Sequence, residues 1–240
     1  YASLRKIEKN PPNMRSLKIP EYIQNRFKFM ARSSGIIAVT GATGEGKSSS
    51  ATAALCYYLE TFGDVAFTIE DPVEYNLQER DWGKKAKCFQ FEIPNNDETK
   101  WDEYIKTAMR FHPRYIFLGE LRTTQAAASA LKAAKSGHLV LTTLHGGSIQ
   151  EGLGALRAMA EPEFGKRVDQ MIADSFLMMT HQRLRPTGVD MQVLHSESVT
   201  MGDSIRSQIR DGKYEMLSTK IESQNSESAK KRVLQIPKFT

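Results

Sequence analysis

The sequence contains little cysteine and no long apolar segment. Two cysteines, Cys56 and Cys88, stand among its 240 residues, which excludes a disulfide framework and a four-cysteine zinc site. No run of about eighteen apolar residues occurs, so we expect no transmembrane helix. The first residues contain no apolar signal-peptide segment, and the chain begins with Tyr1 rather than Met. We therefore expect a piece of a longer, cytosolic protein.

The excess of positive charge is also small. The formal net charge is +5, and the short basic clusters at 84–87 and 230–232 are not interleaved with aromatic residues. A groove that binds nucleic acid uses such aromatic side chains to stack the bases. A solvated face and a solvated tail explain the basic clusters better, so we expect no direct nucleic-acid binding.

Residues 41–48 stand out, with the sequence Gly-Ala-Thr-Gly-Glu-Gly-Lys-Ser. An apolar run at 35–40 precedes them and a helical segment at 49–60 follows, which is typical of a phosphate-binding P-loop rather than of a glycine-rich turn. In such a loop the backbone amides face anionic oxygens, Lys47 reaches the phosphates of a nucleotide, and Ser48 holds Mg²⁺. The expected nucleotide-binding residues are Gly41, Ala42, Thr43, Gly44, Glu45, Gly46, Lys47, Ser48 and Ser49.

A second apolar run, at 64–70, leads into an acidic loop. Glu70, Asp71 and Glu74 stand there, and Pro72 keeps the loop from continuing as a helix. Ligands of open α/β sheets bind at the carboxyl ends of the strands. We therefore expect these acids to serve a function beside the P-loop, although a solvated acidic loop is the alternative.

Two further predicted strands end in polar side chains. The run at 115–118 is followed closely by Glu120, which we expect to meet Mg²⁺ through water or to orient an attacking water. The run at 138–145 has a histidine at each end. A lone histidine more often has a structural role, and that alternative stays open for both. As a candidate for contact with a γ-phosphate, His145 is better than His138 because it stands at the carboxyl end.

Arg110 and Arg122 are candidates for supplying positive charge to a transition state. A surface salt bridge is an equally open role for each of them. The sequence leaves open whether they serve their own subunit or a neighbouring one.

The predicted elements alternate between strands and helices. Strands are expected at 35–40, 64–70, 88–93, 115–118, 138–145, 176–184 and 191–195, and helices at 21–32, 49–60, 99–111, 123–135, 149–159, 164–174 and, in two pieces, within 203–224. This alternation predicts an α/β sheet with helices on both faces. The expected parts are a connector with a first helix at 1–33, the core at 34–185, a small C-terminal helical region at 186–224 and a disordered tail at 225–240.

Four motifs resemble, in this order, those of the secretion ATPases of type II secretion, type IV secretion and type IV pili. They are the P-loop at 41–48, an "Asp box" at 68–75, a Walker B run at 116–122 and a "His box" at 137–145. The resemblance runs from about Ile7 to Gln224. It implies a RecA-like P-loop fold and hydrolysis of ATP with Mg²⁺. On the family's motifs, the general base falls on Glu74 and the carboxylate that supports Mg²⁺ falls on Glu120.

The resemblance also implies partners and a location. Members of this family work as cytoplasmic homohexamers, peripheral at the inner membrane, and move a membrane platform protein so that pilus subunits are added, withdrawn or secreted. The tetracysteine insert of extension and export motors is absent, and residues 204–211 resemble a C-terminal motif of retraction motors. We therefore favour the retraction-like branch, which includes relatives in conjugation and Dot/Icm-type secretion.

Three features depart from the family pattern. Glu45 replaces a small residue of the P-loop, so its carboxylate has to point away from the phosphates. Thr123 stands where the family often has Asp. We also expect that the small N-terminal domain of the family is missing, apart from its connector at 1–20. Two alternatives stay open: a non-catalytic, nucleotide-binding assembly subunit of the same machinery, and a DNA-handling P-loop ATPase.

Overall fold

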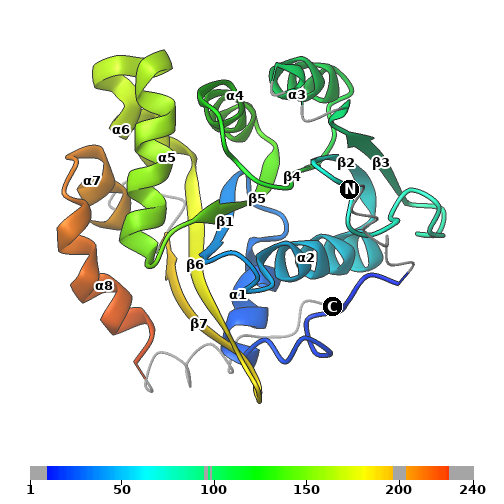
Figure 1. Cartoon of the computed structure of the whole chain (residues 1–240), viewed down its shortest axis with the longest axis horizontal. Helices are drawn as coiled ribbons and strands as arrows, with labels where there is room; N and C mark the ends of the chain where they lie inside the picture. The colour runs from blue at the N-terminus through cyan, green and yellow to red at the C-terminus, as the bar shows by residue number, and fades with distance from the viewer. Residues whose placement is uncertain (1–9, 95–96, 98, 197–203, 227–240) are drawn as a thin grey trace, which may run out of the picture.

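The computed structural model describes residues 10–94, 97, 99–196 and 204–226. A seven-stranded sheet forms its centre, with the strand order β3-β2-β4-β5-β1-β6-β7 (Figure 1). The strands are β1 Gly35–Gly41, β2 Asp64–Glu70, β3 Ala86–Glu92, β4 Tyr115–Leu118, β5 Leu139–His145, β6 Phe176–Arg185 and β7 Gly188–His195. Strands β1 to β6 run parallel, and β7 pairs antiparallel with β6.

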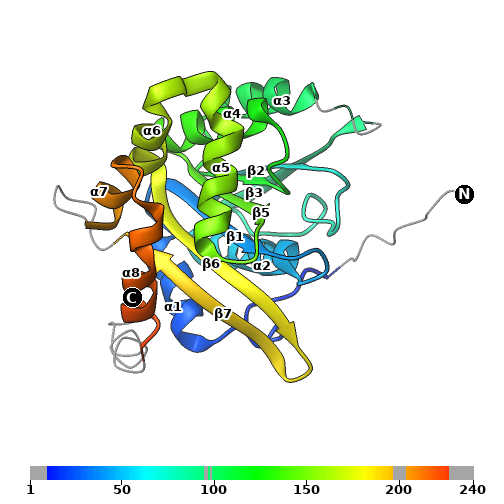
Figure 2. The same cartoon turned by 60° about the vertical axis from the view of Figure 1, so that its left-hand side comes forward.

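Helices cover both faces of this sheet, as the two views in Figures 1 and 2 show. They are α1 Glu21–Met30, α2 Lys47–Phe62, α3 Lys100–Arg110, α4 Thr124–Lys135, α5 Ile149–Phe164, α6 Val168–Ser175, α7 Ser204–Arg210 and α8 Leu217–Gln224. Helices α1 and α2 bury their apolar side chains in the core on one face, and α3 to α8 bury theirs in the core on the other face. The predicted α/β fold with helices on both faces is confirmed.

These two layers explain the sequence patterns of the elements. Strands β1, β4 and β5 are covered on both faces, so they read as apolar runs without alternation. Helix α4 packs closely against the middle of the sheet because half of its side chains are alanine. Thr123 caps this helix: its side chain accepts a hydrogen bond from the Ala126 backbone amide at 3.2 Å. The departure at Thr123 thus has a structural role as a helix cap.

Several expected boundaries differ from the structure, and two of the differences have a clear physical reason. Helix α5 continues through Pro162 to Phe164, where the sequence predicted an end at Met159. Pro162 lacks the amide donor for one helical hydrogen bond, and only two helical residues follow it, so the loss is confined to the last turn. The expected border of the core after residue 185 falls inside the β6–β7 hairpin, because β7 extends the same sheet.

The segments at both ends of the described chain belong to the same fold. On the N-terminal side, the Tyr58 hydroxyl donates to the Phe27 carbonyl at 2.8 Å, and α1 packs on α2. On the C-terminal side, the Asn225 side chain accepts from the Val193 amide at 3.0 Å and donates to its carbonyl at 2.7 Å. Asn225 is therefore held against β7, contrary to the expected start of a tail there. Residues 227–240 of that tail lie outside the described residues.

The two cysteines pack in the core and carry no chemistry of their own. Both thiols are buried. Burial raises the pKa of the Cys56 thiol to about 12 and raises that of Cys88 further. Both side chains therefore stay protonated and act as small apolar groups.

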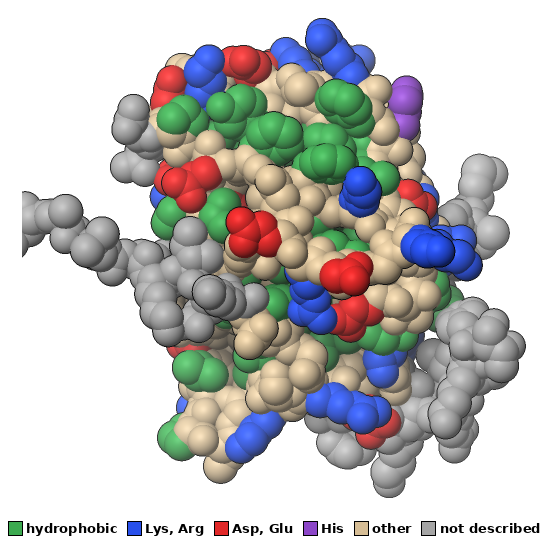
Figure 3. Space-filling model, turned by 90° about the vertical axis from the view of Figure 1, so that its right-hand side faces the viewer, with side chains coloured by type: hydrophobic (Ala, Val, Ile, Leu, Met, Phe, Trp, Pro, Cys, Tyr) green, Lys and Arg blue, Asp and Glu red, His purple; other side chains and the backbone are tan. Residues whose placement is uncertain are grey.

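Hydrophobic side chains gather on the face of the molecule that carries β3 and α3 (Figure 3). The Phe67 ring lies 5.1 to 5.7 Å from the rings of Phe89, Phe91 and Phe111, measured between centroids. Phe111 is 65% exposed and Phe89 41%.

Among the described helices, none combines the length and apolar character needed to cross a membrane.

Candidate nucleotide-binding site

The P-loop lies between the carboxyl end of β1 and the first turn of α2, as the sequence predicts. Gly44 and Gly46 have φ values of +84° and +74°, a backbone conformation that glycine adopts without strain. Gly41 allows a close approach of β6, since a Cβ atom there would lie 2.6 Å from the Gln182 carbonyl oxygen. Helix α2 begins at Lys47, two residues before the expected start at Ser49, so its positive end points at the loop.

Lys47 reaches back across the loop. Its Nζ donates to the Ala42 carbonyl at 2.9 Å. Burial lowers the pKa of the Lys47 ammonium, while the nearby carboxylates of Glu120 and Glu45 act in the opposite direction. A buried cation that is bonded only to a neutral carbonyl is well suited to an anionic partner such as a phosphate oxygen.

A cavity of about 180 Å³ lies against the P-loop, and the ends of several strands contribute to it. Its lining consists of Thr43, Gly44, Gly46, Lys47, Ser48, Ser49, Glu74, Glu120, Arg122, Thr143 and His145. The parallel strands place these residues at one edge of the sheet although the sequence separates them widely. A larger cavity of about 410 Å³, between the connector, α1 and α2, contains none of the predicted site residues.

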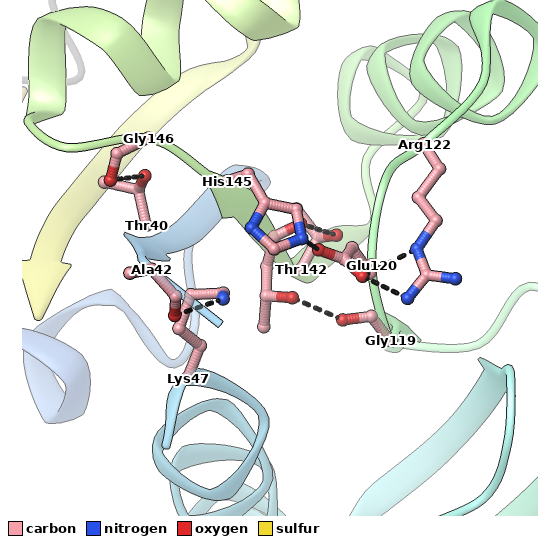
Figure 4. Close-up of polar contacts among 10 residues, drawn as sticks. Thr40, Ala42, Lys47, Gly119, Glu120, Arg122, Thr142, His145 and Gly146 are labelled. Carbon is pink, nitrogen blue, oxygen red and sulfur yellow. Dashed lines mark hydrogen bonds and ion pairs between the residues drawn. The ribbon is translucent and has the colours of Figure 1, made fainter. Parts of the chain in front are cut away.

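Glu120 is the centre of a charged cluster in this cavity (Figure 4). Its Oε2 lies 2.6 Å from Nη2 of Arg122 and also accepts from Nε at 2.7 Å. Its Oε1 lies 2.6 Å from Nε2 of His145, which makes an ion pair when the imidazole is protonated. The side chains of His145 and Arg122 are each 54% exposed, whereas that of Glu120 is 16% exposed. Arg122 and His145 thus both hold the carboxylate of Glu120 at this end of the strands.

The backbone around Glu120 is fixed to β5. The Thr143 hydroxyl donates to the Gly119 carbonyl at 2.7 Å, and the Leu121 amide donates to the Thr143 carbonyl at 3.1 Å. Gly119 also packs on Glu70, whose Cα would lie 3.4 Å from a Cβ atom at that position. Sequence reasoning missed Thr143. The signal was two adjacent threonines inside an otherwise apolar strand.

The acidic loop after β2 also borders the cavity. Glu74 borders both the main cavity and a smaller one of about 50 Å³, which Asp71 and Glu70 also line. Glu70 is only 4% exposed, and burial raises the pKa of its carboxyl group. The Tyr75 hydroxyl shares a hydrogen bond of 2.8 Å with the Ser49 hydroxyl and so connects this loop to α2.

Glu45 turns toward β6. Its carboxylate accepts a hydrogen bond from the Leu184 amide, and its backbone carbonyl accepts one from the Gln182 side chain. The residues that line the cavity do not include it. The carboxylate therefore points away from the place of the phosphates, as expected from the sequence.

Two predicted site residues lie elsewhere. His138 is 6% exposed at the amino end of β5, where its Nδ1 lies 2.6 Å from the Pro113 carbonyl oxygen. A strand rises about 3.3 Å per residue, so the seven steps from His138 to His145 place the two histidines at opposite ends of β5. His138 is thus a structural residue, and its candidacy for phosphate contact is wrong. Arg110 ends α3 near the same amino edge, away from this cavity.

The sequence matches the family described as "Type II/IV secretion system protein" over residues 2–231. The chain belongs to this family. It is 31% identical, over 192 residues, to the type IV pilus retraction ATPase PilT of Pseudomonas aeruginosa, and this match covers 80% of the chain and 54% of PilT. The chain of this secretion-family protein thus spans about half the length of that relative.

Solved structures agree with the fold of the secretion-family chain. The ATPase DotB of Legionella pneumophila matches with a TM-score of 0.74 at 24% identity, over 95% of this chain and 67% of DotB. The pilus retraction motor PilT with bound ADP matches with a TM-score of 0.73 at 23% identity, over 97% of this chain and 69% of PilT. At these identities the comparison concerns the fold alone, and it confirms the predicted α/β sheet with helices on both faces.

Proposed function

We propose that this chain is the ATPase domain of a secretion-family motor and that it hydrolyses ATP with Mg²⁺. The observation that carries the proposal is the meeting of Lys47, Ser48, Glu74 and Glu120 around one cavity. These four side chains supply the charge neutralisation and the water-activating carboxylate that phosphoryl transfer to water requires. Family membership supports the same reading.

The P-loop fits the phosphates of a nucleotide. Its glycines hold backbone amides in conformations that other residues rarely adopt, and α2 adds its positive end. Lys47 exchanges its hydrogen bond to the Ala42 carbonyl for one to a phosphate oxygen. Ser49 is less available than the sequence suggests, because its hydroxyl already bonds to Tyr75.

The donor set also fits Mg²⁺. Ser48 and Glu120 offer a hydroxyl and a carboxylate at the cavity, which suits an ion that takes few protein ligands and keeps several waters. Bound there, Mg²⁺ would neutralise charge on the phosphate oxygens. Arg122 and His145 hold the Glu120 carboxylate in a fixed direction toward that place.

Glu74 is the residue that we assign as general base. Glu74 lines the cavity together with Ser48 and Glu120, where its carboxylate can take a proton from the attacking water. Arg122 lies at the mouth of the cavity and can stabilise negative charge that develops on the γ-phosphoryl group. Asp71 stands beside the smaller cavity and has no assigned step.

We further propose that the motor is a homohexamer on the cytoplasmic side of the inner membrane, where it works on a platform protein of a pilus or secretion system. The retraction-like branch is favoured by the motif at 204–211. In the structure this motif forms α7 and buries Ile205 and Ile209, while Arg206 donates to the Phe176 carbonyl at 2.7 and 3.1 Å. The motif therefore fastens the C-terminal helices to the start of β6.

Release of phosphate from ATP by the full-length protein tests this function. Glu74→Gln should keep ATP binding and lower the turnover number by about 10²- to 10³-fold, because the water loses its base. Normal turnover by this variant would refute the assignment. The non-catalytic alternative predicts no phosphate release by the wild-type protein, and a DNA-handling ATPase predicts DNA binding that weakens steeply with salt.

A further inference from the structure

The side chain of Gln90 on β3 is fully hydrogen-bonded. Its Nε2 donates to Oε1 of Glu70 at 3.1 Å and to the Tyr75 carbonyl at 3.0 Å. Its Oε1 accepts from the amides of Leu77 at 2.6 Å and Gln78 at 2.9 Å. Two acceptors face the nitrogen and two donors face the oxygen, so this orientation of the amide is the one that the surroundings allow.

These four partners lie on both sides of Glu74 in the chain. Glu70 ends β2 before the acidic loop, Tyr75 follows Glu74 directly, and Leu77 and Gln78 come shortly after Tyr75. Gln90 thus connects the segments before and after Glu74 to the neighbouring edge strand, β3. Because it spans the loop from outside the cavity, it makes no contact with the place of the nucleotide.

Tyr75 is held at a second point. Its hydroxyl bonds to Ser49 in the first turn of α2, while its carbonyl bonds to Gln90. The residue next to Glu74 is therefore fixed both to the P-loop helix and to β3. Glu74 has little freedom to move along the cavity while both contacts persist.

We propose that Gln90, assisted by Tyr75, is a positioning residue that sets the place of the Glu74 carboxylate relative to the P-loop. This inference rests on the proposed role of Glu74 as general base. A misplacement of about 1 Å in a reacting group can cost about 10²-fold in rate. Loss of Gln90 should therefore slow the chemical step and leave the binding of ATP nearly unchanged.

Gln90→Met tests this in the full-length protein, because methionine has a similar length and shape but cannot make the four hydrogen bonds. We expect kcat for ATP hydrolysis to fall by about 10- to 100-fold with KM changed less than about threefold. Gln24→Met is the matched control: Gln24 is 8% exposed and donates to the Ile19 carbonyl at 2.7 Å, far from the site. It should keep the wild-type kcat.

A double-mutant cycle separates positioning from a general loss of structure. If Gln90 acts through Glu74, Gln90→Met should lower kcat no further in the Glu74→Gln background. Equal losses in both backgrounds would overturn the proposal, as would a folded Gln90→Met protein with the kcat of the wild type. Normal turnover by Glu74→Gln alone would instead refute the proposed function.

Tyr75→Phe decides the matter if Gln90→Met does not fold, because it removes a single hydroxyl. We expect a loss of about 3- to 10-fold in kcat in the wild-type background and none in the Glu74→Gln background. An unchanged kcat in the wild-type background would overturn the proposal in that case.

Discussion

The two edges of the sheet use the same residue types in different ways. At the carboxyl edge, charged side chains meet each other: His145 and Arg122 converge on Glu120. At the amino edge, side chains of the same kinds bind backbone carbonyls: His138 contacts Pro113, and Arg114 donates to Ser33 at 3.1 Å. The second kind of contact fastens connections between strands, whereas the first leaves a charged cavity. Position along a parallel strand therefore decides what each residue contributes.

The largest expected effect on ATP hydrolysis distinguishes Lys47, a cation at the carboxyl edge, from Arg114, a cation at the amino edge. Lys47→Ala should lower ATP hydrolysis by about 10³-fold or more, because the phosphates lose their buried cation, and should leave the melting temperature close to that of the wild type. Arg114→Met should instead lower the melting temperature and leave ATP hydrolysis by the folded protein close to that of the wild type. Phosphate release and thermal unfolding of both variants check this. Loss of turnover in folded Arg114→Met would break the comparison between the edges.

The two histidines of β5 give a second, intermediate test. His145→Asn should lower kcat by about tenfold, because the Glu120 carboxylate then loses one of the two side chains that position it. The variant should show little change in stability. His138→Asn removes a buried hydrogen bond and should lower the free energy of unfolding by about 1–3 kcal/mol while kcat of the folded protein is retained. Urea unfolding and steady-state kinetics measure the two quantities. Equal effects on kcat would show that the position on the strand does not matter.

The smallest expected effect is that of Glu70→Gln on the free energy of unfolding, and this effect depends on pH. Burial raises the pKa of this carboxyl group above its ordinary value of 4.5, so the folded state binds the proton more tightly than the unfolded state does. The stability that this group contributes is therefore fully present below pH 4.5, the ordinary pKa of the carboxyl group, and is lost as the pH rises through the raised pKa. Glu70→Gln should raise the free energy of unfolding at pH 7 but not at pH 4. Urea titrations at both values check this; a gain at pH 4 would contradict it.

The residues that line the candidate site were largely predictable. The P-loop motif indicates one part of the cavity, and the direction of the parallel strands indicates which strand ends form the rest. The P-loop and the strand ends at Glu74, Glu120 and His145 follow from that rule. His138 precedes its strand, so the same rule, applied strictly, would have excluded it. The hydrogen bonds of Gln90 were not predictable, because they depend on how the loop after β2 folds back onto β3.

The direction of the Glu45 carboxylate was expected, but its partner was not predictable. Strand β6 is the neighbour of β1 in space although more than a hundred residues separate the two in the chain. Local sequence patterns carry no information on such a pairing. Pro162 within α5 illustrates the same limit on a smaller scale, since packing of α5 on α4 outweighs the local preference to end the helix.

The contacts of Glu45 have a mechanical consequence. Leu184 and Gln182 of β6 bind the P-loop at Glu45, and on the far strand of the same hairpin the Met191 carbonyl accepts from the Tyr22 hydroxyl of α1 at 2.6 Å. The loop, the hairpin and α1 are thus joined in series by short, directional links. A displacement of the loop would therefore be passed through the hairpin to α1, the first helix among the described residues.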